Sequence, residues 1–300
     1  MTFLRLIRFP NLIIIILTQC CIRFFLFEKF EVSPALELFD FFLLVIATVC
    51  LAAGGNIIND IYDVETDWVN KPSKLIIGKK ISEKTALVFY IIFNFIAVGI
   101  GFYLSHRIGK SGFSVLFILI SALLYFYSSR LKQSFLIGNI LIGFLISLVF
   151  LIVGIFDLLP NFHFSNSENR HAFNILFHFS IFAFLINFLR EMLKDQEDIN
   201  GDYKTGMKTM PIVLGRSRAN KIIAVFSILP IAGIVYYIYT YLYENTFAVL
   251  FVLFFILGPL LYFAIKIFEI KKKRDYKRMS LILKILMLIG ILAIVFYPEF

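Results

Sequence analysis

Residues 38–67 read LFDFFLLVIATVCLAAGGNIINDIYDVETD. Residues 38–58 of this stretch are almost wholly apolar, and a helix needs about 20 such residues to cross the hydrocarbon core of a membrane. The segment that follows at once, 59–67, holds four carboxylates. The stretch therefore predicts a membrane-spanning helix that carries an acidic segment to the membrane surface.

The composition of the whole chain agrees with a membrane protein. Of the 300 residues, 60% are hydrophobic and 16% are charged, whereas soluble globular proteins have about 45–50% apolar and about 25% charged residues. A water-soluble domain could not bury so much apolar surface, so a cytosolic or secreted enzyme is excluded. The net charge of +9 does not indicate nucleic-acid binding, because no soluble module carries a clustered basic face.

Nine runs are long and apolar enough to cross the membrane. They cover residues 9–27, 38–58, 85–105, 113–128, 134–156, 172–190, 219–242, 246–268 and 279–297. The first run follows only Arg5 and Arg8 and has no small-residue cleavage site, so we read it as a retained helix. The predicted fold is an all-α, polytopic membrane bundle of nine transmembrane helices, forming a single domain over residues 1–300.

The distribution of cations predicts the orientation of this bundle. Of the 29 Lys and Arg residues, 23 fall on one side of the nine predicted spans and 5 on the other. Cytoplasmic loops are the ones enriched in Lys and Arg. We therefore expect the N-terminus in the cytoplasm and the protein in the cytoplasmic (inner) membrane.

Two acidic clusters follow predicted spans on the side rich in cations. If the second span continues as a helix, Asn59, Asp63 and Asp67 are spaced four residues apart and share one face. After the sixth span, a shared face is likewise predicted for Glu191, Asp195, Asp198 and Asp202.

Clustered carboxylates repel one another unless cations lie among them. Mg²⁺ suits such a site, because it binds through one or two carboxylates completed by water and substrate phosphates. The spacing thus predicts two opposed clusters that hold Mg²⁺ ions and grip a diphosphate, with phosphate-binding cations at Lys71, Lys74, Arg190 and Lys194. The alternative is two solvated loops whose acids pair with nearby lysines; the repeated spacing at two span ends favours a functional site.

At these residues the sequence resembles the UbiA superfamily of intramembrane prenyltransferases. The first motif of that family, N-D-x-x-D-x-x-x-D, matches Asn59, Asp60, Asp63 and Asp67, and the second, D-x-x-x-D, matches Asp198 and Asp202. Within the superfamily, residues 190–202 resemble the geranylgeranylglycerol-phosphate geranylgeranyltransferases. One departure is Lys71, where many members have Arg; Lys keeps the charge but lacks the bidentate fork for phosphate.

The resemblance implies Mg²⁺-dependent transfer of a prenyl chain from an allylic diphosphate, geranylgeranyl diphosphate, to a lipophilic acceptor, a glycerophosphate ether lipid. It implies catalytic roles for Asp63, Asp67, Asp198 and Asp202. The expected metal ligands are Asn59, Asp60, Asp63, Asp67, Asp195, Asp198 and Asp202. The expected diphosphate-binding residues are Lys71, Lys74, Lys132, Arg190 and Lys194. Membrane lipids are further partners, and the Phe-rich helices supply an apolar slot for the isoprenoid tail.

Other functions remain open from the sequence. The acceptor of a prenyltransferase could instead be an aromatic quinone precursor or haem. A cation-coupled transporter also combines many spans with acidic residues, although transport sites usually lie near the bilayer midplane, whereas these acids gather at one mouth. A catalytically silent member of the family is a third alternative, against which the intact carboxylates argue.

Overall fold

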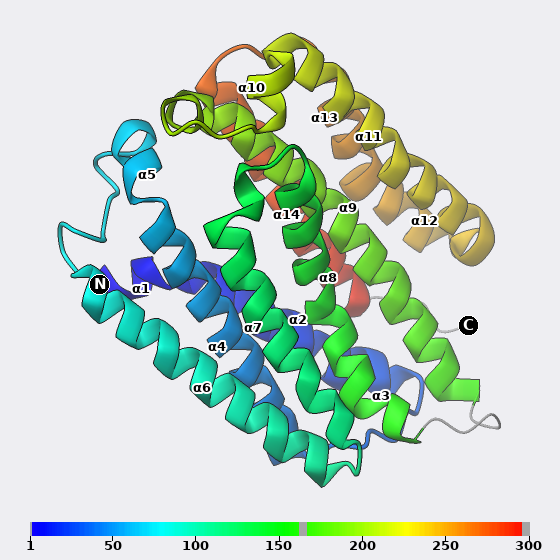
Figure 1. Cartoon of the computed structure of the whole chain (residues 1–300). Coiled ribbons are helices and arrows are strands. Elements are labelled where there is room, and N and C mark those ends of the chain that lie inside the picture. Colours follow the sequence, from blue (N-terminus) through cyan, green and yellow to red (C-terminus); the bar gives the residue numbers. More distant parts are fainter. Residues whose placement is uncertain (1, 162–166, 296–300) are drawn as a thin grey trace. The chain divides into compact units, whose positions relative to one another are not determined.

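The computed structural model describes residues 2–161 and 167–295, and in these residues every regular element is a helix (Figure 1). Nine helical segments in the described residues are long and apolar enough to cross a membrane. They cover Phe9–Lys29, Leu38–Tyr62, Glu83–Arg107, Ser111–Ser129, Ile137–Asn161, Ser167–Lys204, Arg216–Leu242, Thr246–Lys266 and Lys273–Val295. The predicted all-α, nine-span fold is thus confirmed; residues 296 and 297 of the last predicted span lie outside the described residues.

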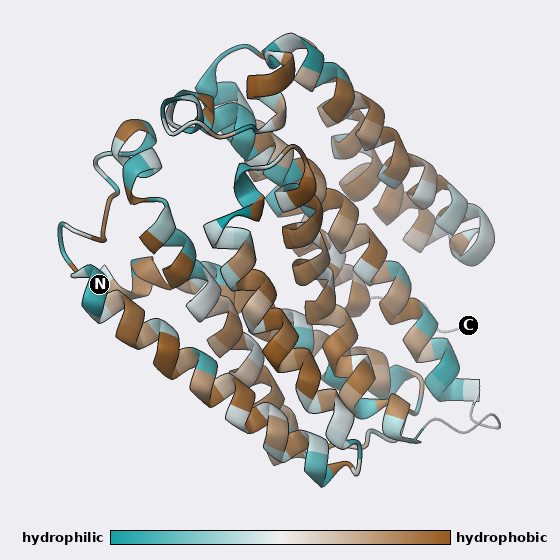
Figure 2. Cartoon of the chain, in the orientation of Figure 1, coloured by the Kyte–Doolittle hydropathy of each residue, from teal (hydrophilic) through white to brown (hydrophobic). Residues whose placement is uncertain are grey.

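Several spans are built from more than one helical element. The α-helices are α1 (Thr2–Leu6), α2 (Phe9–Cys21), α3 (Phe27–Lys29), α4 (Leu38–Tyr62), α5 (Val64–Asn70), α6 (Glu83–Arg107), α7 (Ser114–Ser129), α8 (Ile137–Asp157), α9 (Ser167–Lys204), α10 (Met210–Leu214), α11 (Arg216–Tyr237), α12 (Thr246–Val252), α13 (Gly258–Lys266) and α14 (Lys273–Val295). Short 3₁₀ elements are η2 (Ser111–Phe113), η3 (Leu131–Gln133) and η4 (Leu159–Asn161), and π-helical turns are η1 (Ile22–Leu26), η5 (Ile238–Leu242) and η6 (Leu253–Leu257). Figure 2 shows that apolar residues dominate the long helices and that hydrophilic residues gather toward their ends.

The chain divides into two compact units. Unit 1 consists of residues 1–132 and 148–177, and unit 2 consists of residues 133–147 and 178–300. Both acidic clusters are therefore intact within a unit, the first in unit 1 and the second in unit 2. The two units are described separately below.

Helix α4 is the central element of unit 1 and packs against α2, α6 and α7. Small residues permit this close approach, which in membranes supplies much of the attraction between helices. A Cβ atom on Gly55 would lie 2.9 Å from a methyl carbon of Leu124 on α7, and one on Gly54 would lie 2.9 Å from the amide nitrogen of Asn94 on α6. Asn94 in turn accepts a 2.5 Å hydrogen bond from Ser121 of α7. Glycine packing and an interhelical hydrogen bond thus hold α4, α6 and α7 together.

A buried ion pair fixes the other end of unit 1. Arg23 lies 3.1 Å from Asp157, whose side chain is fully buried, and Arg23 also donates a 2.8 Å hydrogen bond to the carbonyl of Leu36. The same carboxylate accepts a 3.1 Å hydrogen bond from the backbone nitrogen of Leu36. One carboxylate therefore joins the first span, the loop before α4 and the end of α8.

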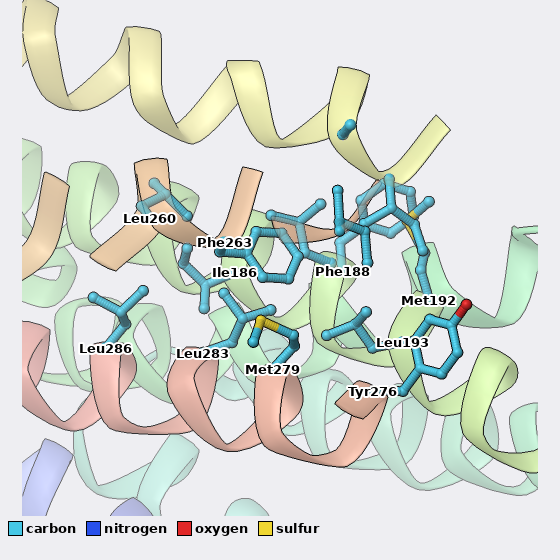
Figure 3. Packing of buried hydrophobic residues seen from close by; sticks show 14 of the residues in the cluster. Ile186, Phe188, Met192, Leu193, Leu260, Phe263, Tyr276, Met279, Leu283 and Leu286 are labelled. Atoms are coloured by element: carbon cyan, nitrogen blue, oxygen red, sulfur yellow. The ribbon is translucent and has the colours of Figure 1, made fainter. Parts of the chain in front are cut away.

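Unit 2 is held by an apolar core that α9, α11, α13 and α14 share. Side chains of α9 such as Ile186 and Met192 interdigitate with Phe263 of α13 and with Met279 and Leu283 of α14 (Figure 3). All five are almost completely buried. This core fixes the face of α9 that points into the unit, and so it decides where the polar residues of that helix can lie.

We expect Asp157→Ala to destabilise the protein by about 3 kcal/mol, because removing one partner of a buried pair leaves the other charge buried without compensation. Thermal unfolding in detergent, followed by circular dichroism, measures the change. Glu37→Ala is the matched control, since Glu37 also pairs with an arginine of unit 1, Arg107 at 3.2 Å, but its side chain is 75% exposed. Equal effects of the two substitutions would contradict the structural role of the buried pair.

Candidate functional site

The first acidic cluster lies where α4 ends. The continuous helix expected over residues 59–67 is interrupted at Asp63, which has φ −92° and ψ 2° and separates α4 from α5. Backbone hydrogen bonds nevertheless run from Asp63 to Asn59 (2.9 Å) and from Asp67 to Asp63 (2.7 Å). The chain therefore keeps a helical path through the motif but bends at its central carboxylate.

Asp63 is the centre of a small polar network. One of its carboxylate oxygens accepts a 2.7 Å hydrogen bond from the side-chain amide of Asn59, and the other lies 2.5 Å from the ammonium of Lys132. The Lys132 side chain is only 9% exposed. A largely buried lysine beside this carboxylate supplies the positive charge that an acidic motif at a membrane boundary needs. The structure thus brings together three of the predicted site residues.

The other residues of the first motif have different surroundings. Asp60 lies 2.8 Å from Arg8, which sits between α1 and α2, so this carboxylate ties the start of the chain to the end of α4. Lys71 caps α5 and is half-buried, and Lys74 is exposed in the turn that follows. The ligand role predicted for Asp60 therefore stays a prediction, and Arg8 is a partner that sequence reasoning left out of the site.

The second acidic cluster lies on an unbroken helix. Helix α9 has 38 residues and is about 57 Å long, which exceeds the roughly 30 Å of a hydrocarbon core. At about 100° per residue, Glu191, Asp195, Asp198 and Asp202 fall within an arc of about 60°. The continuous helix confirms that the four carboxylates share a face.

A buried hydrogen-bond network sets the rotation of α9 around its axis. Gln196 is fully buried and donates hydrogen bonds to the Asn220 side chain (2.9 Å) and to the Arg216 carbonyl (3.1 Å). Asn220 also accepts a 3.1 Å hydrogen bond from the hydroxyl of Tyr276 and donates one to the carbonyl of Ile270. Because these hydrogen bonds hold Gln196 in the interior of unit 2, the acidic face of α9 lies on a different side of the helix from Gln196.

Cations and an amide contact the carboxylates of the second cluster. The Asn139 amide of α8 donates a 2.8 Å hydrogen bond to Asp195, and Lys273 of α14 lies 3.7 Å from Asp198. Glu191 is 2.5 Å from Lys194 and 3.7 Å from Arg190. Two predicted diphosphate-binding cations are thus beside a carboxylate of the cluster.

Asn139 and Lys273 were not predicted as site residues. Asn139 stands in the first turn of α8, and Lys273 belongs to a basic run, residues 271–274, where α14 begins. Both contacts could not be predicted because each residue is far in sequence from its partner on α9. The one available signal was the position of each residue at the cation-rich end of its predicted span.

The donor chemistry of both clusters fits Mg²⁺. The side chains offer carboxylate and amide oxygens, which are the hard ligands that Mg²⁺ takes. The described residues contain no group of three or more His, Cys, Asp or Glu side chains gathered closely enough to enclose a metal ion. Mg²⁺ is usually held by one or two carboxylates together with substrate phosphates, so a complete protein cage is not required. Asn59 and Asp63 in unit 1 meet this requirement, and Asp195 and Asp198 offer the corresponding oxygens in unit 2.

Known proteins resemble this chain both in sequence and in fold. A digeranylgeranylglyceryl phosphate synthase from Methanopyrus kandleri is 37% identical over 61% of this chain and 60% of the relative. A solved structure of digeranylgeranylglyceryl phosphate synthase has a TM-score of 0.66 and 21% identity, covering 98% of each chain. A UbiA homologue from Archaeoglobus fulgidus bound to GPP and Mg²⁺ has a TM-score of 0.60 and 15% identity, covering 98% of this chain and 99% of that chain. These two structures have the same fold as this chain.

The family assignment follows from the sequence as a whole. The model of the UbiA prenyltransferase family matches residues 28–297, which include both acidic motifs and eight of the nine spans found in the described residues. Together with the apolar helices, this match establishes an integral, multi-pass membrane enzyme. The chain belongs to the UbiA prenyltransferase family.

Proposed function

We propose that this protein transfers a geranylgeranyl chain from geranylgeranyl diphosphate to a glycerophosphate lipid that already carries one such chain, giving digeranylgeranylglyceryl phosphate. The name of the Methanopyrus relative supports this acceptor. In the reaction the bond between C1 of the allylic chain and the diphosphate oxygen breaks, and the acceptor hydroxyl oxygen bonds to C1. The diphosphate leaves with the electron pair, and the hydroxyl proton is released.

The observation that carries the proposal is the pair of carboxylate clusters with a cation beside each. We assign metal binding to Asn59, Asp63 and Asp67 and to Asp195, Asp198 and Asp202. Bound Mg²⁺ would neutralise the diphosphate and stabilise it as a leaving group; the Archaeoglobus homologue with GPP and Mg²⁺ supports this cofactor.

The cations near the clusters have a separate task. Lys132, Arg190 and Lys194 supply positive charge from partly buried side chains, which are 9%, 19% and 34% exposed, and an ion pair that is shielded from water is stronger than one in water. We propose that they bind phosphate oxygens of the donor, together with Lys71 and Lys74. With Mg²⁺ bound at Asp63, the Lys132 ammonium would be available to contact a diphosphate oxygen in place of that carboxylate. Asp60, which lies beside Arg8, is a further proposed metal ligand of the first cluster.

We also propose that both clusters lie at the cytoplasmic face of the cytoplasmic membrane. The asymmetry of the cations, 23 of the 29 on the side of the clusters, supports this orientation, which places the N-terminus in the cytoplasm. The family match across residues 28–297 supports residues 1–300 as a single domain.

Replacing Asp63 or Asp198 by Ala should lower the Mg²⁺-dependent transfer of a radiolabelled geranylgeranyl chain by more than about 100-fold, because even residues that only support a metal ligand cost 10–100-fold. Glu197→Ala is the matched control for Asp198→Ala, since Glu197 is adjacent on α9 but lies about 100° around the helix. Full activity of both cluster variants, with normal expression, would refute the two-cluster proposal.

Mg²⁺ binding can be measured without turnover, because Trp68 is the single tryptophan of the chain. Trp68 follows Asp67 directly, is 59% exposed and stacks with the Lys79 ammonium at 4.6 Å. We expect Mg²⁺ to change its fluorescence, and Asp67→Ala to raise the apparent Kd about tenfold or more. Glu83→Ala, at the exposed start of α6, should leave the titration unchanged; a Mg²⁺ response that survives Asp67→Ala would count against a metal at this cluster.

Lys132→Gln should affect Mg²⁺ and the donor in opposite directions. The substitution removes the positive charge 2.5 Å from Asp63, which leaves that carboxylate available to Mg²⁺. The Trp68 titration should therefore give a several-fold lower Kd for Mg²⁺. The KM for geranylgeranyl diphosphate should rise about tenfold, because one charge-assisted contact is lost. Lys84→Gln, at an exposed position of α6 outside the proposed site, provides the comparison. A parallel weakening of both affinities would show that Lys132 acts only by supporting the fold.

A further inference from the structure

Unit 2 contains an apolar cavity of about 350 Å³ that the proposed reaction does not use. Its wall is formed by residues of α9, α11, η5, α12, η6 and α14. The volume falls within the roughly 300–1,000 Å³ of small-molecule sites in proteins. Both π-helical turns of unit 2, η5 and η6, contribute to the wall through Leu242 and Ile256, and such turns often accompany functional sites.

The cavity is separate from the second acidic cluster. His178, Phe182 and Leu185 line it from α9, and the centre of this face lies about 140° around the helix from the acidic face. Along the axis, the lining residue Leu185 is six residues, or about 9 Å, from Glu191, and His178 is about 30 Å from Asp198. Ile186 and Phe188, which follow Leu185 on α9 and precede Glu191, belong to the apolar core of the unit (Figure 3). The cavity is therefore not an extension of that cluster.

The side chains that line the cavity determine which kind of ligand it can bind. Among residues 2–161 and 167–295, no Lys, Arg, Asp or Glu lines the cavity, and the polar side chains that line it are His178 and three tyrosines. Water is unstable in a cavity with so few polar partners, and an empty cavity forfeits the contacts of its lining atoms. A hydrocarbon chain satisfies both conditions, whereas a diphosphate would find no cation in the wall.

The cavity also has an opening and a polar end. Of the lining residues, Tyr236 and Phe247 are 61% and 74% exposed, whereas Ile234 and Ile256 are buried. At one end His178 lies against Tyr237 and Tyr241, with ring centroids 5.5 and 5.4 Å away. These tyrosines stand where the seventh span ends, and Tyr side chains are enriched at the level of lipid headgroups. A lipid chain inserted from the bilayer would therefore leave its headgroup near the tyrosines.

We propose that this cavity binds one acyl chain of a membrane phospholipid as a structural lipid, at a site distinct from the prenyl-transfer site. The chain lies against Phe182 and Phe251, and its headgroup is placed at the His178–Tyr237–Tyr241 end. The inference does not rest on the proposed function, because it uses only the geometry and chemistry of the cavity.

The test uses the full-length protein in nanodiscs made with phosphatidylcholine that carries a diazirine in its acyl chain. After irradiation, mass spectrometry compares adducts on Phe182 and Phe251 with adducts on Phe95, which is 79% exposed on α6. We expect at least fivefold more label per residue in the cavity. Equal or lower labelling of the cavity residues would overturn the proposal.

A variant that closes the cavity makes the test specific. Gly233 lines the cavity, and a Cβ atom there would meet no atom within 4 Å, so Gly233→Leu should fit and reduce the cavity adducts at least fivefold. Gly99→Leu is the matched control, because Gly99 is an exposed helical glycine of unit 1 with equally open surroundings. If Gly233→Leu fails to give a monodisperse protein, Gly233→Val replaces it. Unchanged cavity labelling in a folded variant would refute the site.

Two further measurements separate this site from the reaction. Excess geranylgeranyl diphosphate should leave the cavity adducts unchanged; a loss of label would assign the cavity to the prenyl donor and overturn the phospholipid assignment. Asp198→Ala should retain full labelling even where transfer is lost. Failure of the transfer proposal and failure of the lipid proposal therefore give different results.

Discussion

A carboxylate at the edge of a low-dielectric medium must be matched by a cation, and most polar features of this protein follow from that requirement. Asp63 has Lys132, Asp60 has Arg8, Asp157 has Arg23 and Asp198 has Lys273. Each pair joins residues that are far apart in sequence, so each also joins helices. Electrostatic neutrality and helix packing are therefore satisfied by the same contacts.

The carboxylates of the two acidic clusters are neutralised differently from the buried carboxylate of Asp157. The Arg23–Asp157 pair is buried and is tied to the backbone of Leu36 by two hydrogen bonds. The cation beside Asp63 is a lysine, a flexible side chain with a compact charge that changes partners readily. A pair that can be exchanged suits a site where a metal ion and a charged substrate arrive and leave, whereas a pair tied to the backbone suits a permanent joint.

Much of the fold could be predicted because an apolar segment inside a membrane can adopt few secondary structures. Apolar runs of about 20 residues have few alternatives to a helix, and all nine predicted spans agree with the described helices. The spacing of the acids on α9 was equally readable, since no Pro or Gly interrupts that helix before Gly201. The sites themselves stay a prediction: the family assignment is established, and the role of each carboxylate is not.

What the sequence could not predict depends on tertiary contacts. Nothing in residues 59–67 marks Asp63 as the place where the helix bends, because the motif contains neither Pro nor Gly. Lys273 and Asn139 reach α9 from other spans, and one sequence without relatives carries no signal for such pairs. The network of Gln196, Asn220 and Tyr276 was missed for the same reason, although it determines which face of α9 is acidic.

The bend at Asp63 makes the geometry of the two motifs different. On α9 the carboxylates are carried by one unbroken helix, so their mutual spacing is set by the helix repeat. In the first motif Asp67 belongs to a separate seven-residue helix, so its position relative to Asn59 depends also on the backbone of Asp63. The placement of the oxygens in the first motif thus depends on one residue, whereas on α9 it is a property of the whole helix.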